Sequence, residues 1–403
     1  MWANIYEERT GLIRCKKPVI SKLPSHKIEE GMKVVYTEEP IPDRYISSAT
    51  SVMPSSINKL FKPEAPPNLN PLPYNEPKPG QLQVGVLRMI GIGDVVMTIP
   101  LLKSIKDSYP NAHITYYTGE VGKWSLLDVP FVDRVEVVDF DFAHSGHPAT
   151  PPPLRNKHDV MLNLVNRVDF GNIVLQRPRA DNFILVSRYQ SGLDLRLNQS
   201  FIIPEMKVDT AWAQELLSLN GVDPQLDVII GCQITSHGIP RRWPSEKWCK
   251  LATALPEIKF IFFSDEPRIF SMPVPPNVIN TSGMLGVPEF ISLLGVCDVL
   301  VCPDSSFMHL GARLRKRTII LAGSTDPKLH LKYYPKDLFT IIWAEQRPKC
   351  SPCYDWQLSS CQGKIGAPWC MNRIKVRQVA NAILSVLEED KDEDRGLLHL
   401  LQR

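Results

Sequence analysis

The sequence predicts an α/β protein in which two consecutive series of strands and helices follow a proline-rich extension. A strand, a glycine-rich turn, a helix and a second strand follow one another from residue 81, and a second series of this kind starts near residue 227. Of the 36 prolines, 12 fall in the first 80 residues. Strands that alternate with helices are typical of parallel sheets covered by helices.

Composition and charge narrow the function classes. The 403 residues carry 46 basic and 43 acidic side chains, a formal net charge of +3, which argues against a strongly basic nucleic-acid-binding surface. The chain has no apolar run long enough for a transmembrane helix, and its first residues lack the features of a secretion signal. We therefore expect a cytoplasmic protein with reduced thiols, for which peripheral membrane contact stays open.

The extension spans residues 1–80, and its prolines cluster between residues 62 and 80. Proline fixes φ and removes a backbone donor, so this stretch cannot form a helix or a central strand. Residues 34–36 are a strand candidate. Two interpretations stay open, a poorly ordered tail and an arm that wraps the globular body or contacts a partner.

The first α/β domain is expected over residues 81–221. Strands are predicted at 82–89, 112–118, 135–140, 160–165 and 183–186, and helices at 96–109 and near 209–220. The second domain is expected over residues 222–373, and residues 374–403 should form a last helix and a charged tail. Strands of the second domain are predicted at 228–231, 259–263, 299–302 and 318–322, and its helices at 245–255, 288–296 and 307–314. The last helix is predicted at 374–387.

A glycine-rich turn joins the first strand to its helix. Gly91 and Gly93 permit a tight turn, but Val96 replaces the third glycine of the dinucleotide-binding fingerprint. Asp94 follows at the start of the helix, at the sheet edge where such folds bind ligands, and could take a proton from a substrate hydroxyl. The alternative is that Asp94 only caps the helix.

Two neighbouring strand ends in the second series carry small polar residues that suit a phosphate at a helix start. The candidates are Asp304, Ser305, Ser306 and His309 in the first loop and helix, and Gly323, Thr325 and Asp326 in the second loop. Before another helix, Arg241 or Arg242 could bind a diphosphate through two parallel hydrogen bonds. Helix capping, a core histidine and an ordinary basic loop are the alternatives.

Four of the nine cysteines fall within 21 residues, namely Cys350, Cys353, Cys361 and Cys370. In a reduced compartment this spacing suggests a tetrahedral zinc site. Four thiolates would complete the coordination, so the zinc would be structural. The alternatives are a disulfide-prone cluster or unligated thiols.

These blocks, in their order and spacing, resemble glycosyltransferase family 9, the group of the bacterial lipopolysaccharide heptosyltransferases. Residues 88–102 are similar to the family's R-x-x-x-x-G-D signature, and Arg241-Arg-Trp-Pro resembles K-x-W-P. Residues 304–310 resemble D-S-G-P-M-H-L, residues 323–327 resemble G-x-T-D-P, and the cysteines look like the family's C-terminal cluster. The resemblance covers residues 82–388.

The resemblance implies a GT-B fold, in which two Rossmann-like domains face each other across a cleft. It implies an inverting transferase without a catalytic metal that moves a sugar from a nucleotide-diphosphate sugar to an acceptor hydroxyl, here on a surface glycan or lipid-linked saccharide. Asp94 would be the base and Arg241 would contact the diphosphate. The turn from Asp304 to His309 and Thr325 would hold the donor phosphates and sugar.

Three other functions stay open. The proline-rich extension and the basic residues 313–317 suggest the same transfer onto a modified nucleic-acid base. Ser306 and Phe307 replace a glycine and a proline of the family, which suggests a nucleotide-sugar-binding protein without catalysis. A nicotinamide or flavin oxidoreductase is disfavoured by the broken glycine fingerprint.

Overall fold

The computed structural model describes residues 2–7, 32–37, 50–52, 60–89, 91–139, 151–165, 177–267, 270, 273–354, 361 and 368–389. The chain divides into two compact units, Met1–Leu60 and Phe61–Arg403. None of the described helices is both long and apolar enough to cross a membrane. Residues 390–403, which include most of the expected charged tail, lie outside the described residues.

The first unit contains a three-stranded antiparallel sheet in the order β2-β1-β3. Its strands are β1 (Trp2–Glu7), β2 (Met32–Thr37) and β3 (Thr50–Val52). The predicted strand at residues 34–36 lies within β2. The other two strands were not predicted.

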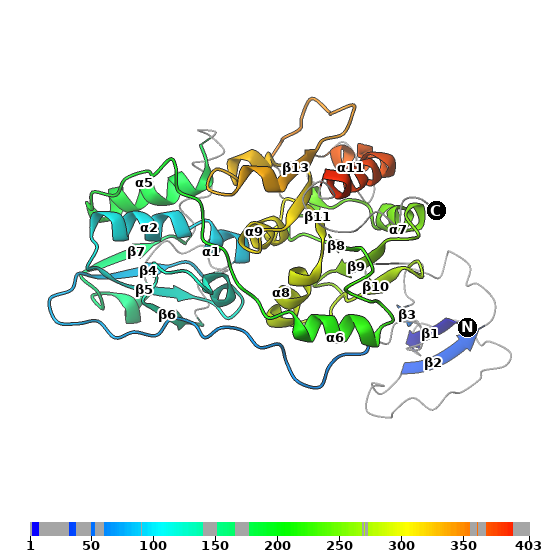
Figure 1. Cartoon of the computed structure of the whole chain (residues 1–403), viewed down its shortest axis with the longest axis horizontal. Helices are drawn as coiled ribbons and strands as arrows, with labels where there is room; N and C mark the ends of the chain where they lie inside the picture. Colours follow the sequence, from blue (N-terminus) through cyan, green and yellow to red (C-terminus); the bar gives the residue numbers. More distant parts are fainter. Residues whose placement is uncertain are drawn as a thin grey trace. The chain divides into compact units, whose positions relative to one another are not determined.

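The second unit begins its α/β part with a four-stranded parallel sheet in the order β6-β5-β4-β7 (Figure 1). The strands are β4 (Gln83–Leu87), β5 (His113–Thr118), β6 (Arg134–Val137) and β7 (Val160–Asn163). The same part of the chain contains the helices α1 (Ile92–Val96), α2 (Ile99–Ser108) and α5 (Arg179–Ser191), and α2 packs against α5. Short 3-10 helices lie at η4 (Gly122–Leu126) and η5 (Pro152–Leu154).

Two predictions for this part need correction. The strand expected at residues 183–186 is wrong, because the segment lies inside helix α5. Short apolar runs occur in both strands and buried helices, and here Ala180, Phe183, Ile184 and Ser187 form the buried stripe of a helix. The helix expected from residue 96 to 109 is two helices, α1 and α2, and Pro100 lies in the first turn of α2, where its missing N–H is tolerated.

The second part of this unit contains a six-stranded parallel sheet in the order β10-β9-β8-β11-β12-β13. The strands are β8 (Ile229–Gln233), β9 (Lys259–Phe263), β10 (Val278–Asn280), β11 (Val299–Pro303), β12 (Arg317–Leu321) and β13 (Phe339–Ile342). All five residues of β11 are buried, as expected for a central parallel strand covered on both faces. Edge strands β10 and β13 are short and were not predicted.

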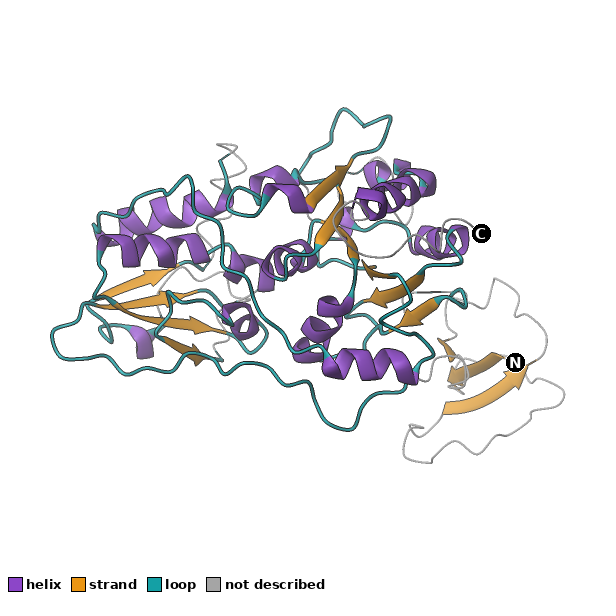
Figure 2. Cartoon of the chain, viewed as in Figure 1, coloured by secondary structure: helices purple, strands orange, loops and turns teal. Residues whose placement is uncertain are grey.

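Helices flank the second sheet (Figure 2). They are α6 (Ala211–Leu219), α7 (Ser245–Ala254), α8 (Val287–Val296), α9 (Ser306–Arg313), α10 (Trp369–Arg373) and α11 (Val376–Glu389). The 3-10 helices are η6 (Ile239–Arg241), η7 (Pro327–Leu329) and η8 (Lys336–Leu338). Helix α7 packs on α11 and α6 packs on α8. Gly221 follows α6 with a φ of 76°, as expected for a helix C-terminus.

The described end of the proline-rich extension, residues 61–80, contacts both α/β parts of the second unit. The Asn220 amide donates to the Phe61 carbonyl at 2.8 Å, and the Lys62 ammonium lies 3.0 Å from the Glu289 carboxylate. Farther along, Asn70 donates to Asp128 at 3.0 Å. For residues 61–80, the interpretation as an arm along the globular body therefore holds.

Candidate active site

The site forms where α1, which follows strand β4, packs against α9, which follows strand β11. Gly93 lies at this contact, and a Cβ atom there would come within 2.3 Å of Cδ2 of His309. Only a residue without a side chain allows so close an approach. The glycine therefore brings the neighbouring Asp94 to the polar residues that follow β11.

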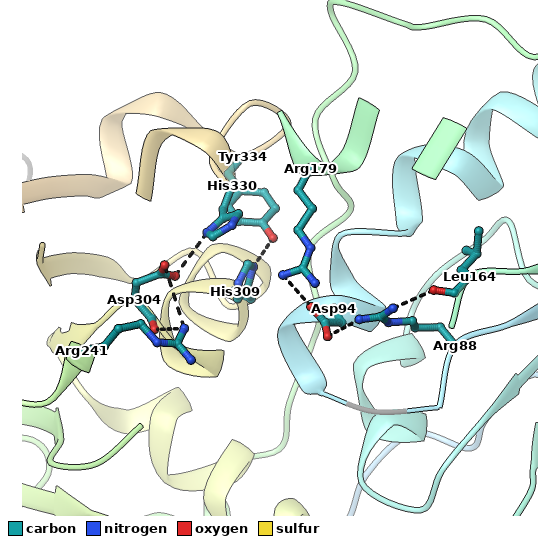
Figure 3. A network of polar contacts seen from close by, with 9 residues as sticks. All are labelled: Arg88, Asp94, Leu164, Arg179, Arg241, Asp304, His309, His330 and Tyr334. Carbon is teal, nitrogen blue, oxygen red and sulfur yellow. Dashed lines mark hydrogen bonds and ion pairs between the residues drawn. The ribbon is translucent and has the colours of Figure 1, made fainter. Parts of the chain in front are cut away.

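Two guanidinium groups hold the Asp94 carboxylate (Figure 3). Arg88 Nη2 lies 2.5 Å from Oδ2, and Arg179 Nη1 lies 3.0 Å from Oδ1. Burial alone would raise the pKa of Asp94, but the charges of Arg179 and Arg88 outweigh it and lower the pKa to about 2. The side chain is 22% exposed, and its carboxylate is ionised at neutral pH. These ion pairs, not helix capping, account for its position.

Asp304 ends the opposite strand with a buried carboxylate. His330 Nδ1 lies 3.2 Å from its Oδ1, while Arg241 donates to its backbone carbonyl at 2.6 Å and lies 4.0 Å from Oδ2. Burial opposes ionisation, but the charges of His330 and Arg241 hold the pKa well below its usual range. Ser305 is the N-cap residue of α9, but its hydroxyl donates to Gln233 and to the Pro303 carbonyl instead of capping the helix.

His309 is buried, and its Nδ1 is hydrogen-bonded to the Tyr334 hydroxyl. Burial and then the charge of His330 lower the pKa of His309 to about 3, so the ring is neutral at physiological pH. Burial also keeps the pKa of Tyr334 well above its usual value. A neutral ring with Nδ1 engaged leaves Nε2 as a hydrogen-bonding atom on the side that faces Gly93.

The structure separates the two predicted arginines. Arg241 joins Asp304, whereas Arg242 donates to the Ser236 carbonyl at 2.8 Å and pairs with Glu266 at 2.6 Å. Asp326 also has a local role, because it accepts from the backbone N–H of Lys328 at 3.1 Å and caps η7.

The remaining predicted residues lie at the expected strand ends. Ser306 is the first residue of α9, and Thr325 is buried in the loop after β12. Gly323 packs tightly, since a Cβ atom there would come within 2.4 Å of Sδ of Met371 and 2.9 Å of Sγ of Cys370.

Four residues of the site were not predicted as site residues, namely Arg88, Arg179, His330 and Tyr334. Arg88 belongs to the block that resembles the family signature, which was a usable signal. The other three come from α5 and from the segment between η7 and η8, and no local pattern marks them. They reach the site through tertiary packing.

A group of possible metal ligands lies within the site. One ligand atom each from Asp304, His309 and His330 lies within 4.8 Å of the others. Arg241 stands beside the same carboxylate, and Arg179 is close enough for its charge to lower the pKa of His309. Neighbouring cations oppose a divalent cation and favour an anionic ligand.

The four predicted metal-binding cysteines come together. Cys350, Cys353, Cys361 and Cys370 all line one cavity of about 50 Å³. Burial and the neighbouring thiols raise the pKa of Cys370 to about 11. Among the described residues, no three of these sulfurs lie within 4.8 Å of one another. A zinc ion with Zn–S bonds of about 2.3 Å would hold them roughly 3.8 Å apart, so zinc binding needs the sulfurs to move closer together.

Two parallel-sheet parts that meet at strand ends, with a carboxylate on one side and a basic, polar cluster on the other, define a glycosyltransferase of the GT-B class. The model of glycosyltransferase family 9 (heptosyltransferase) matches residues 180–359. The matched segment comprises 180 of the 403 residues, and the match confirms the resemblance seen in the sequence.

Three similar proteins illustrate the match. Lipooligosaccharide heptosyltransferase 2 of Haemophilus influenzae is 26% identical over 305 residues, which cover 62% of this chain and 85% of the relative. The E. coli ADP-heptose lps heptosyltransferase II structure has a TM-score of 0.56 at 17% identity, over 77% of this chain and all of the other. The iron-containing dodecameric glycosyltransferase TibC of E. coli has a TM-score of 0.51 at 12% identity, over 98% of this chain and 94% of the other.

Proposed function

We propose that the protein is an inverting heptosyltransferase that moves the sugar of ADP-heptose to an acceptor hydroxyl on a lipopolysaccharide-type glycan or other lipid-linked saccharide. The carrying observation is the position of Asp94, which faces Arg241, Asp304 and His309 across the contact of α1 with α9. The names of the relatives support the choice of heptose and ADP. The cytoplasmic location stays a prediction.

In the proposed reaction, Asp94 accepts the proton of the acceptor hydroxyl. The hydroxyl oxygen bonds to the anomeric carbon on the face opposite the diphosphate, so the configuration at that carbon inverts. The bond from this carbon to the diphosphate oxygen breaks, and the electron pair leaves with the diphosphate. No metal ion is needed, because positive side chains stabilise the leaving group.

We assign the residues that would bind the donor by matching their charges and hydrogen-bonding groups to the diphosphate and the sugar. Arg241 supplies a positive charge that is 15% exposed for the diphosphate, and the amide end of α9 at Ser305 and Ser306 adds backbone donors. Asp304 and the neutral His309 can bond sugar hydroxyls, and Thr325 lies at the neighbouring strand end. Gly93 and Gly323 permit close packing, whereas Arg242 and Asp326 take supporting roles.

The donor class is tested by thermal unfolding with ADP-heptose, UDP-, GDP- and CMP-sugars and NAD. A ligand at about 100 times its dissociation constant adds about 2.7 kcal/mol of stability, so the melting temperature should rise with ADP-heptose. Arg241→Gln should lose this shift, and the exposed Arg196→Gln should keep it. A shift with NAD alone would favour an oxidoreductase. A melting-temperature shift with a sugar nucleotide, but no sugar transfer in an activity assay, would favour the non-catalytic alternative.

A nucleic-acid acceptor is a less favoured alternative. Arg313, the first residue of the basic stretch that suggested it, is buried and donates to the Ser125 carbonyl at 2.7 Å and to the Leu127 carbonyl. A salt-dependent affinity for DNA in filter binding would revive this alternative.

We also propose a structural zinc site at Cys350, Cys353, Cys361 and Cys370, because all four line one cavity. Such a site would brace the segment between β13 and α10 without a catalytic role. Metal analysis of the purified protein should find about one metal ion per chain, and Cys350→Ser with Cys353→Ser should lose it. Zinc-free wild type would contradict the proposal. Iron in its place, the metal in the name of TibC, would correct the metal and keep the site.

A further inference from the structure

The two arginines that hold Asp94 come from different elements. Arg88 also donates from Nη1 to the Leu164 carbonyl at 2.7 Å, and its guanidinium lies 5.7 Å from the Phe183 ring centre. Its place at the end of β4 is therefore fixed by main chain and core. Arg179 is the first residue of α5, and its guanidinium extends from that helix to Oδ1 of Asp94 (Figure 3).

Arg179 also faces the proposed donor residues. Its side chain lies between Asp94 and His309 in the site (Figure 3). Burial lowers the pKa of Arg241; the charges of Asp304 and Asp94 oppose this shift, and the charge of Arg179 adds to it. An anion bound beside Arg241 would therefore also attract Arg179.

The ion pair with Arg179 conflicts with the proposed role of Asp94. A general base acts best when its pKa is near the working pH, and the two arginines hold the pKa of Asp94 at about 2. An acceptor hydroxyl also needs a carboxylate oxygen within hydrogen-bond reach. The oxygen Oδ1 is paired with Arg179, which extends toward the proposed donor residues, whereas Oδ2 is paired with Arg88 (Figure 3).

We propose that Arg179 exchanges the Asp94 carboxylate for the donor diphosphate, so that donor binding prepares the base for the acceptor. The inference rests on the proposed function. The guanidinium leaves Oδ1 and pairs with a non-bridging phosphate oxygen, while Arg88 keeps Oδ2 in place. Oδ1 then accepts the hydroxyl proton as the oxygen–carbon bond forms. The bond from carbon to diphosphate breaks, and Arg179 with Arg241 neutralises the departing charge.

The exchange predicts that Asp94 and a diphosphate compete for Arg179. We would measure ADP binding by calorimetry for the wild type, Arg179→Gln, Asp94→Asn and the double variant. Arg179→Gln should weaken ADP binding about tenfold, the value of one charge-assisted hydrogen bond. Asp94→Asn should strengthen it several-fold because the arginine is released. The gain should vanish in the double variant.

The matched control is Arg188→Gln, which removes an exposed arginine from the same helix and should leave ADP binding unchanged. Arg179→Lys keeps the charge and should retain part of the affinity, which covers the case that Arg179→Gln does not fold. If Asp94→Asn strengthens binding equally in the Arg179→Gln background, simple repulsion explains the gain and the exchange is wrong. Unchanged affinity in Arg179→Gln also overturns it. Absence of ADP binding in the wild type would instead refute the proposed donor.

Discussion

The carboxylate of Asp94 is the proposed proton acceptor, and it also forms two ion pairs. Replacing it with Asn keeps the shape of the side chain but removes the proton acceptor. Turnover should fall by about 10²- to 10⁴-fold, the usual contribution of general base catalysis, while donor binding persists. Initial rates and donor calorimetry on the same preparation check this. Turnover close to that of the wild type would show that another group is the base.

The lowered pKa of Asp94 also affects stability. Its ordinary pKa of 3.8 falls to about 2 in the folded protein, so the carboxylate stabilises the fold above pH 4 and loses this contribution as the pH falls toward 2. The shift corresponds to about 2 kcal/mol. The stability difference between wild type and Asp94→Asn should therefore shrink by about two thirds of this amount on acidification from pH 5 to pH 2.5. Denaturant unfolding at each pH measures it, and a constant difference would contradict the ion-pair account.

The residues of the site differ in how well the sequence predicted them. Asp94, Asp304 and His309 follow strand ends, so the strand pattern placed them at one edge, whereas Arg241 was singled out as a basic residue before a helix. The side chains that set their charge, Arg179, His330 and Tyr334, come from segments without a local signal. Their roles depend on how α5 and the segment between η7 and η8 pack, which spacing in the sequence does not express.

At the scale of elements, the contact of α1 with α9 depends on Gly93. Gly93→Ala would place a Cβ atom 2.3 Å from His309. Relief of this overlap should cost about 1–3 kcal/mol of stability and displace Asp94. Gly286→Ala is a suitable control, because the atom nearest to a Cβ there is 3.8 Å away. Thermal unfolding and initial rates would test both variants, and a fully active Gly93→Ala protein would argue against this contact in the working enzyme.

Periodicity and turn residues predicted most strands of the two parallel sheets, because buried parallel strands are continuous apolar runs. The prediction was wrong at residues 183–186, where four apolar residues belong to helix α5. Strands β10 and β13 were not predicted, because they are short edge strands. The sheet of the first unit is antiparallel and includes two strands that were not recognised at all.

At the scale of the molecule, a buried ion pair joins the first helix-covered sheet to the segment that follows β12. Asp181 on α5 accepts from Lys332 Nζ and from the Tyr333 hydroxyl, both at 2.6 Å. Asp181→Ala would leave the buried hydroxyl and the ammonium without this acceptor and should cost about 3 kcal/mol. The exposed pair of Lys103 and Asp107 provides the control, since Asp107→Ala should cost less than about 1 kcal/mol. Equal losses in urea unfolding would contradict the structural role.

The central claim is that this chain transfers heptose from ADP-heptose with inversion, using Asp94 as the base. The direct measurement incubates the protein with ADP-heptose and a glycolipid extract from cells that lack this protein, followed by NMR of the product. We expect release of ADP, a transferred heptose whose anomeric configuration is opposite to that in the donor, and transfer by Asp94→Asn that is slower by at least about 100-fold. Transfer with retained configuration, or by the Asn variant at the wild-type rate, would contradict it.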